Sequence, residues 1–136
     1  MPTWELEIEV EAPPDEVWGF VGDPTTVPRW YPKYVSCEVD GETRVLRSAE
    51  GAELVERLLE RDEARRTYAY SVRSGAPVSA HRASFAVVPS GDGSRVVWRT
   101  EAEPSDPAVD LRARLVPTQT DALRRIKEIV EGGAAD

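Results

Sequence analysis

Hydrophobic positions near the C-terminal end of the chain recur at the spacing of a helix. Apolar residues stand at 115, 116, 122, 123, 126, 129 and 130, three or four positions apart, which predicts a helix with one buried face over residues 116–131. Gln119 lies on the same stripe, one turn before Leu123. Pro117 either begins this helix or kinks it, because proline has no backbone N–H to donate. We expect this long helix to cover a sheet.

Most of the preceding chain alternates between apolar and polar residues, the period of a strand with one buried face. In the first strand, residues 4–11, Trp4 and the apolar positions after it point inward, and a row of glutamates faces water. The alternation predicts further strands at 34–40, 43–48, 52–61, 66–73, 78–89 and 95–103. The strand at 52–61 carries apolar residues on both faces, so the pattern alone leaves its inner face undecided.

Two short helices are predicted between the first and second strands. Pro14 can open a helix with acidic residues in its first turn, and this helix stops near Gly22. A second helix or turn covers residues 25–30, and Pro32 blocks its extension. The order of elements predicts an α+β fold, with a curved seven-stranded antiparallel sheet, two short helices after the first strand and a long C-terminal helix. We expect a single domain over residues 1–136.

Composition and charge narrow the classes of function. With 40% hydrophobic and 31% charged residues the chain is typical of a globular protein. The net charge of -8 argues against nucleic-acid binding and against an anionic membrane surface. One cysteine, Cys37, excludes an internal disulfide, and one histidine, His81, excludes a His-rich metal site, so we expect no metal. No signal pattern or membrane-spanning run is seen, and a cytoplasmic location is expected.

Several segments together carry a family resemblance. They are residues 11–18 with Asp23 and Trp30-Tyr31-Pro32, residues 51–58 with Asp62, residues 66–70, the hairpin 83–98, and residues 123–127. In this order and spacing, the chain resembles the START-like, Bet v 1-like (SRPBCC) superfamily. Within it, the chain is most similar to the bacterial polyketide cyclase/dehydrase-type group, and the high share of arginine among the basic residues fits a bacterial origin.

The resemblance implies a helix-grip fold with a cavity between the sheet and the C-terminal helix. Members of this superfamily bind lipids, sterols, hormones or polyketides there, and some catalyse cyclisation or dehydration. The resemblance also resolves the ambiguous strand: Glu56 should face the cavity, while Arg57 and Arg61 point outward. It further implies that loops 48–52 and 74–79 guard the cavity mouth.

The expected lining is mostly apolar and aromatic, as in most small-molecule pockets. The predicted ligand-binding residues are Trp30, Leu54, Glu56, Leu58, Tyr68, Tyr70, His81, Ala83, Phe85, Trp98, Gln119, Leu123 and Ile126.

Glu56, Tyr70 and His81 are candidate acid/base groups. Residues two strands apart lie about 10 Å from each other, so Glu56 and His81 could flank a ligand with Tyr70 between them. Burial would move the pKa of each toward its neutral form, which suits enolisation, cyclisation or dehydration. The alternative is that Glu56 bonds an arginine or a tyrosine and that His81 is only a residue of the wall.

Two function hypotheses lead. The first is a protein that binds or carries a hydrophobic small molecule, such as a lipid, an isoprenoid or a polyketide, without a cofactor and without covalent chemistry. The second is an aromatase-type cyclase or dehydratase that needs neither a metal nor a nucleotide. A scaffold with a collapsed cavity would need an exposed apolar patch that the sequence does not supply. Either a monomer or a homodimer is compatible with the sequence, without nucleic-acid partners or stable membrane insertion.

Overall fold

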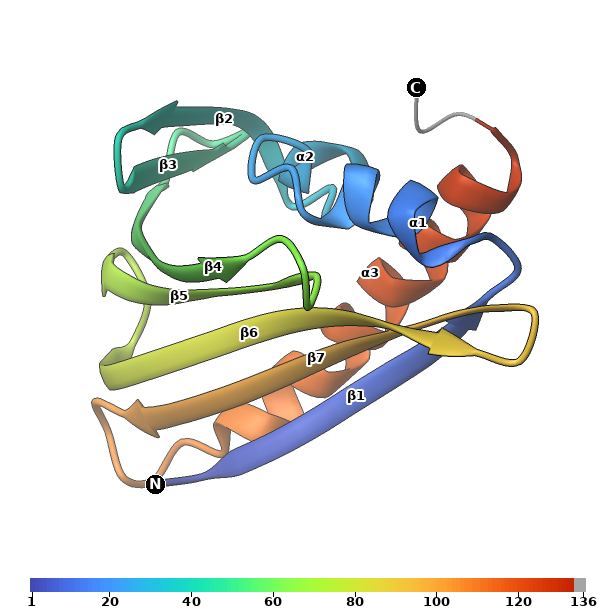
Figure 1. Cartoon of the computed structure of the whole chain (residues 1–136). Coiled ribbons are helices and arrows are strands. Elements are labelled where there is room, and N and C mark those ends of the chain that lie inside the picture. The colour runs from blue at the N-terminus through green and yellow to red at the C-terminus, as the bar shows by residue number, and fades with distance from the viewer. Residues whose placement is uncertain (134–136) are drawn as a thin grey trace.

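A curved sheet wraps around one long helix. The computed structural model describes residues 1–133. The strands are β1 (Thr3–Val10), β2 (Tyr34–Asp40), β3 (Thr43–Ser48), β4 (Glu53–Asp62), β5 (Thr67–Ser74), β6 (Val78–Ser90) and β7 (Gly93–Pro104), and the helices are α1 (Pro14–Val21), α2 (Val27–Trp30) and α3 (Leu111–Glu131). The strands pair antiparallel in the order β1-β7-β6-β5-β4-β3-β2. In Figure 1 the sheet curls past α3, with α1 and α2 on the side of β2. The predicted fold is therefore confirmed.

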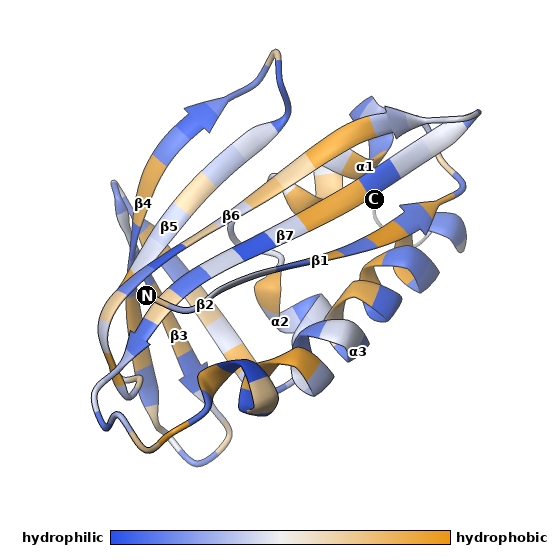
Figure 2. Ribbon diagram, turned by 90° about the horizontal axis from the view of Figure 1, so that it is seen from below, coloured by the Kyte–Doolittle hydropathy of each residue, from blue (hydrophilic) through white to orange (hydrophobic). Residues whose placement is uncertain are grey.

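The terminal helix begins earlier than the hydrophobic pattern suggested. Asp110 is its N-cap, and the Asp110 carboxylate accepts a hydrogen bond of 3.0 Å from the backbone N–H of Ala113. Leu111, the first helical residue, is buried and draws this turn against the sheet. Pro117 lies inside the helix, so it does not begin it. In Figure 2 hydrophobic and hydrophilic residues alternate along α3, as expected for a helix with one buried face.

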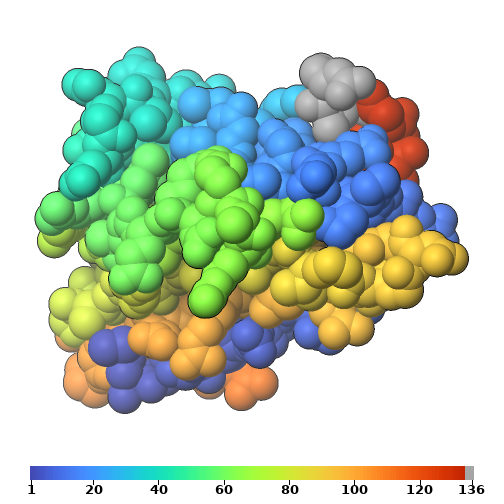
Figure 3. Space-filling model, in the orientation of Figure 1, coloured from blue at the N-terminus to red at the C-terminus, as the bar shows by residue number. Residues whose placement is uncertain are grey.

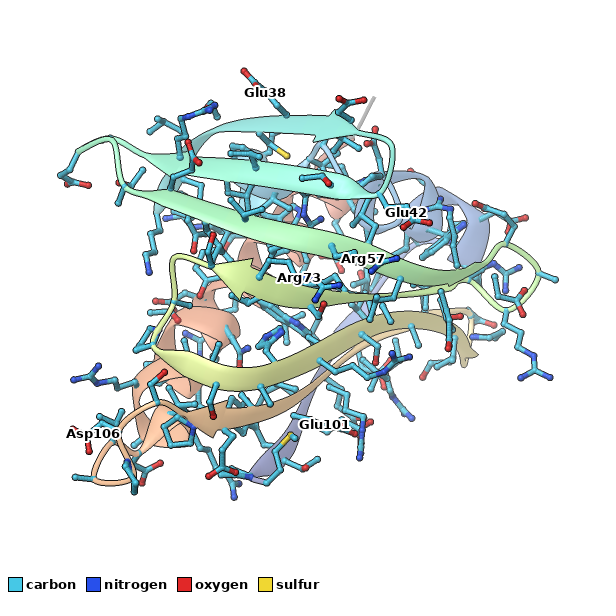
Figure 4. The ribbon with its side chains drawn as sticks, turned by 90° about the vertical axis from the view of Figure 1, so that its left-hand side faces the viewer. Glu38, Glu42, Arg57, Arg73, Glu101 and Asp106 are labelled. Carbon is cyan, nitrogen blue, oxygen red and sulfur yellow. The ribbon has the colours of Figure 1, made fainter. Side chains whose placement is uncertain are left out.

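Strand β4 changes the face that its side chains occupy partway along. Leu58 pairs with Tyr70 but Arg61 pairs with Tyr68, so β4 carries one extra residue in a β-bulge. Before the bulge Glu56 faces inward, and Arg57 lies on the outer face in an ion pair of 3.1 Å with Glu42, as Figure 4 shows.

The bulge reverses the direction of Arg61, which the family resemblance had placed outward. Its guanidinium reaches the carbonyl oxygen of Gly22 and lies 4.8 Å from the centre of the Trp18 ring. The Trp18 indole N–H donates to Glu63 at 2.7 Å, so the β4–β5 turn is joined to α1. Figure 3 shows this turn beside the α1 segment. The prediction for Arg61 was wrong because one inserted residue reverses the parity of a strand.

The interior under α1 and the C-terminal half of α3 is filled by side chains. Phe85 and Trp98 stack with ring centres 4.6 Å apart, and Trp30 meets each ring edge-on. Leu123 and Ile126 of α3 are buried against the same cluster. Aromatic pairs of this geometry each add about 0.5–1.5 kcal/mol beyond the burial of their area. The sheet therefore has its own packed core at this end.

Candidate functional site

The other end of the interior is a cavity of about 400 Å³ between the sheet, α2 and the N-terminal half of α3. Its wall comes from strands β3 to β7, from α2 and the residues after it, from the loop between β5 and β6, and from α3. The lining residues are Val27, Trp30, Tyr31, Lys33, Tyr34, Arg44, Leu46, Leu54, Glu56, Tyr70, Val72, Gly75, Ala76, Pro77, Val78, His81, Trp98, Thr100, Leu111, Arg114, Leu115, Thr118 and Gln119.

The predicted ligand-binding residues divide between the cavity and the packed core. Those that line the cavity are Trp30, Leu54, Glu56, Tyr70, His81, Trp98 and Gln119. Those that lie in the packed core instead are Leu58, Tyr68, Ala83, Phe85, Leu123 and Ile126. The alternation places both sets on the same inner face, but the aromatic cluster fills the space beside α1. Only the end near α2 and the start of α3 stays open.

A buried ion pair forms part of the cavity wall. The Arg44 side chain donates to Oε1 of Glu56 from Nε at 2.8 Å and lies 2.7 Å from it at Nη2. Arg44 also donates to the carbonyl oxygen of Pro24 at 3.2 Å, and its guanidinium lies 4.9 Å from the centre of the Tyr70 ring. Both residues are almost fully buried, at 2% and 4% exposure. This contact agrees with the alternative prediction, in which Glu56 bonds an arginine.

The pairing leaves one oxygen of Glu56 without a protein partner. Nε and Nη2 of Arg44 both contact Oε1, and no residue within 1–133 donates to Oε2. Burial raises the pKa of Glu56, against the lowering effect of Arg44. Sequence reasoning missed Arg44, although the alternation of residues 43–48 places it on the same face as the buried Leu46.

His81, two strands away from Glu56 in the same sheet, is held as a neutral side chain. Its Nδ1 accepts a hydrogen bond of 3.1 Å from the backbone N–H of Val72, so the single proton of the neutral ring lies on Nε2. Burial lowers its pKa to about 4. At neutral pH His81 can therefore donate to a ligand from Nε2, and it carries no charge.

The register places Val72, and not Tyr70, directly between Glu56 and His81. Glu56 pairs with Val72, whose amide meets His81, while Tyr70 pairs with Leu58 and Ala83. The expected position of Tyr70 was therefore wrong by one inward position along β5, because strand alternation gives the face of a residue but not the residue that pairs with it. Tyr70 still lines the cavity, with its ring centre 5.7 Å from that of His81.

Two other polar groups of the wall already have protein partners. The Tyr70 hydroxyl accepts a hydrogen bond of 3.0 Å from the Trp98 indole N–H, and burial raises the pKa of this tyrosine well above its ordinary value. Gln119 accepts from the Trp4 indole N–H at 2.8 Å and donates to the Thr100 hydroxyl at 3.2 Å. Gln119 thus joins α3 to β1 and β7, and it is occupied by structural contacts.

A hydroxyl pair joins α2 to α3 at the cavity mouth. The oxygens of Tyr31 and Thr118 lie 3.0 Å apart. Thr118 donates its hydrogen to the carbonyl of Leu115 at 2.9 Å, so Tyr31 is the donor of the pair. The Tyr34 ring packs edge-on against Tyr31. No motif marked this contact in the sequence, because it joins residues distant in the chain.

The loop between β5 and β6 also borders the mouth. Gly75, Ala76 and Pro77 of the expected mouth loop 74–79 line the cavity, whereas no residue of the expected mouth loop 48–52 does. Gly75 has a φ of 94°, and a Cβ there would lie 2.1 Å from the carbonyl oxygen of Glu53. This loop therefore depends on a glycine to approach β4.

Residues 1–133 contain no group of three or more His, Cys, Asp or Glu side chains able to hold a metal ion. Within the same range, no helix has both the length and the apolar character needed to cross a membrane.

The sequence matches the protein family described as "Polyketide cyclase / dehydrase and lipid transport" over residues 1–131. A comparison with curated proteins finds no match.

Solved structures of the same fold include proteins of different kinds. The protein XoxI from Bacillus cereus has a TM-score of 0.86 at 23% identity, over 96% of each chain. The di-domain ARO/CYC BexL from the BE-7585A biosynthetic pathway has a TM-score of 0.81 at 24% identity, over 96% of this chain and 47% of BexL. Norcoclaurine synthase from Thalictrum flavum, solved with dopamine and hydroxybenzaldehyde, has a TM-score of 0.74 at 20% identity, over 95% of this chain and 86% of the enzyme.

Proposed function

Because the chain belongs to the polyketide cyclase/dehydrase and lipid transport family, whose members share the Bet v 1-like helix-grip fold, we propose that it binds and carries a hydrophobic small molecule in the cavity under α3. The candidate ligands are lipids, isoprenoids and polyketide-like compounds. The proposal includes a cytoplasmic carrier, as a monomer or homodimer, without a nucleic-acid partner or a cofactor.

The observation that carries this proposal is the open cavity itself. A volume of about 400 Å³ falls in the range of small-molecule sites. Aromatic and aliphatic side chains such as Trp30, Leu54 and Val72 supply most of the wall, and burial of apolar ligand surface there contributes about 25 cal/mol per Å².

Two polar groups of the wall can orient a ligand. Oε2 of Glu56 can accept a hydrogen bond from a hydroxyl, and Nε2 of His81 can donate one to a carbonyl or ether oxygen. The two groups lie on opposite sides of Val72. A ligand with an apolar body and one or two oxygens therefore fits this wall better than a pure hydrocarbon does.

Native mass spectrometry of gently purified protein tests the proposal. We expect a bound mass that is released by denaturing extraction. Val72→Phe places a ring in the cavity and should abolish the bound species, while Val88→Phe on the outer face of β6 should retain it. A bound mass that persists in Val72→Phe at wild-type level would refute binding in this cavity.

Glu56 supports a second candidate function, catalysis of a cyclisation or dehydration. A buried carboxyl with a raised pKa beside the cavity is a suitable group for proton transfer. His81 is a weaker candidate as a base, because its Nδ1 is occupied by the Val72 amide.

The co-purified ligand also separates the two functions. A carrier returns the ligand unchanged after incubation, whereas a dehydratase releases water and yields a product lighter by that mass. Glu56→Gln should stop such turnover in an enzyme and only alter affinity in a carrier, and circular dichroism should first show that the variant is folded.

A further inference from the structure

The cavity lining is positively charged although the protein as a whole is acidic. The chain has a formal net charge of -8. Among the described residues of the lining, Lys33, Arg44 and Arg114 are cations, and Glu56 is the one carboxylate. Glu56 and Arg44 neutralise each other in their ion pair. The lining therefore keeps two cations, Lys33 and Arg114, without a matching acid.

Each of these two cations stands near one partner of the Tyr31–Thr118 contact in the sequence. Lys33 follows α2, two residues after Tyr31, and Arg114 stands one helical turn before Thr118 on α3. Positions four apart in a helix share one face, so Arg114 points the same way as Thr118. Because the two hydroxyls meet at 3.0 Å, both cations belong to the same mouth of the cavity.

Neither cation is occupied by an acidic residue of the protein. Within residues 1–133 no carboxylate lies within ion-pair distance of Lys33 or Arg114, whereas arginines such as Arg57 and Arg95 on the sheet have acidic partners. The Lys33 ammonium lies 5.6 Å from the centre of the Tyr34 ring, a contact that leaves its N–H groups free for an anion. Both side chains are exposed and can be reached from solvent.

We propose that the ligand is an anionic amphiphile whose carboxylate lies at the mouth between Lys33 and Arg114. Its apolar body extends inward along Trp30, Leu54 and Val72. This inference rests on the proposed binding function and specifies the chemical class of the ligand. The guanidinium of Arg114 offers paired donors to a carboxylate, and Lys33 adds a mobile point charge.

The solvent at the mouth limits the size of the effect. An exposed ion pair contributes little by itself, so two of them together correspond to a preference of roughly fivefold to tenfold for the anion over a neutral ligand of equal shape. The preference must decrease with added salt, because exposed charges are screened.

Titration calorimetry with two matched probes, 2-naphthoate and the neutral 2-naphthamide, tests the inference at pH 7. We expect 2-naphthoate to bind wild-type protein with a Kd roughly fivefold to tenfold lower than that of 2-naphthamide. In the double variant Lys33→Gln/Arg114→Gln the two Kd values should become equal, because the carboxylate loses both of its cationic partners. Arg112→Gln is the matched control, since it removes one exposed charge from the same helical turn outside the lining and should preserve most of the preference.

The outcomes separate this inference from the binding function. Equal Kd values in wild type, or a preference that survives the double variant, would overturn the anionic ligand while leaving a hydrophobic binder. An equally large loss of preference in Arg112→Gln would also overturn it, because net charge alone would then explain the effect. If neither probe binds, the proposed cavity function fails, and this inference fails with it.

Discussion

Removal of one member of the Arg44–Glu56 pair should destabilise the protein far more than removal of both. Either single substitution leaves a charge inside the wall without its partner. With exposures of 2% and 4%, neither remaining charge can turn toward water without opening the structure. Replacing one partner of such a pair costs about 3–5 kcal/mol, while replacing both by apolar residues of similar size is often nearly neutral.

The expected loss of unfolding free energy can be converted into a decrease in melting temperature. For 136 residues the entropy of unfolding is about 0.29 kcal/mol/K, so each 1 kcal/mol corresponds to about 3–4 °C. We expect Glu56→Leu to lower Tm by roughly 10–17 °C and the double variant Arg44→Met/Glu56→Leu by no more than about 7 °C. Arg44→Met also loses the contact with the Pro24 carbonyl, so it should lie at the upper end.

The pH dependence of the single variants provides a second check. In Arg44→Met the pKa of Glu56 rises further, since burial raises it and the lowering effect of Arg44 is gone. The folded state then binds a proton more tightly than the unfolded state, so this variant regains stability as pH falls toward the ordinary carboxyl pKa. Glu56→Leu leaves an arginine that stays charged and should show no such recovery.

Urea unfolding of the four proteins, followed by circular dichroism, completes the double-mutant cycle. If the two single effects simply add in the double variant, the two residues act independently. That result would refute the reasoning that an unpaired buried charge causes the loss.

Three further predictions concern other positions of the site. His81 has a pKa of about 4 in the folded state, below the ordinary 6.5, so wild type should lose up to about 3 kcal/mol of stability as pH falls from 6.5 to 4. His81→Asn retains an acceptor for the Val72 backbone amide but has no group that titrates. Its stability, measured by urea unfolding, should therefore not fall between pH 6.5 and pH 4. Gly75→Ala should destabilise the protein by several kcal/mol, because the new Cβ would meet the backbone of β4. The control Gly51→Ala has a similar φ of 89° but open space around it, and it should cost about 1–2 kcal/mol. Equal melting temperatures for the two variants would contradict the close approach of Gly75 to β4. Gln119→Leu should cost about 1–3 kcal/mol by leaving the Trp4 indole N–H buried without an acceptor, and a neutral result in thermal melts would show that this bond adds nothing.

Much of the fold could be predicted because each element obeys a local rule. The alternation in β1 and the proline at the start of α1 depend on neighbouring residues only. The bulge in β4 could not be predicted, because it depends on how β4 pairs with β5 and not on its own composition. The part of α3 before residue 116 was missed for a related reason: it is fixed by burial of Leu111 against the sheet, which the apolar spacing within the helix does not indicate.

The cavity was harder to predict than the fold. Strand alternation points both His81, which lines the cavity, and Phe85, which lies in the packed core, toward the interior. Which of them meet empty space depends on the sum of side-chain volumes across several elements. Arg44 was missed because an arginine on a strand is usually exposed, and only the pairing of β3 with β4 brings it opposite Glu56.

Because the interior is divided into a packed end and a hollow end, selection for stability and selection for ligand preference can act on different residues. The Phe85–Trp98 cluster and the Leu123 side of α3 stabilise the fold whether or not a ligand is present. Half-buried apolar residues that border the hollow, such as Val72 and Leu115, give up fewer packing contacts when they change, unlike the Arg44–Glu56 pair in the same wall. Mutational drift can therefore reshape ligand preference while the stability of the scaffold stays nearly constant, and a lineage can exchange one ligand for another without passing through unfolded intermediates.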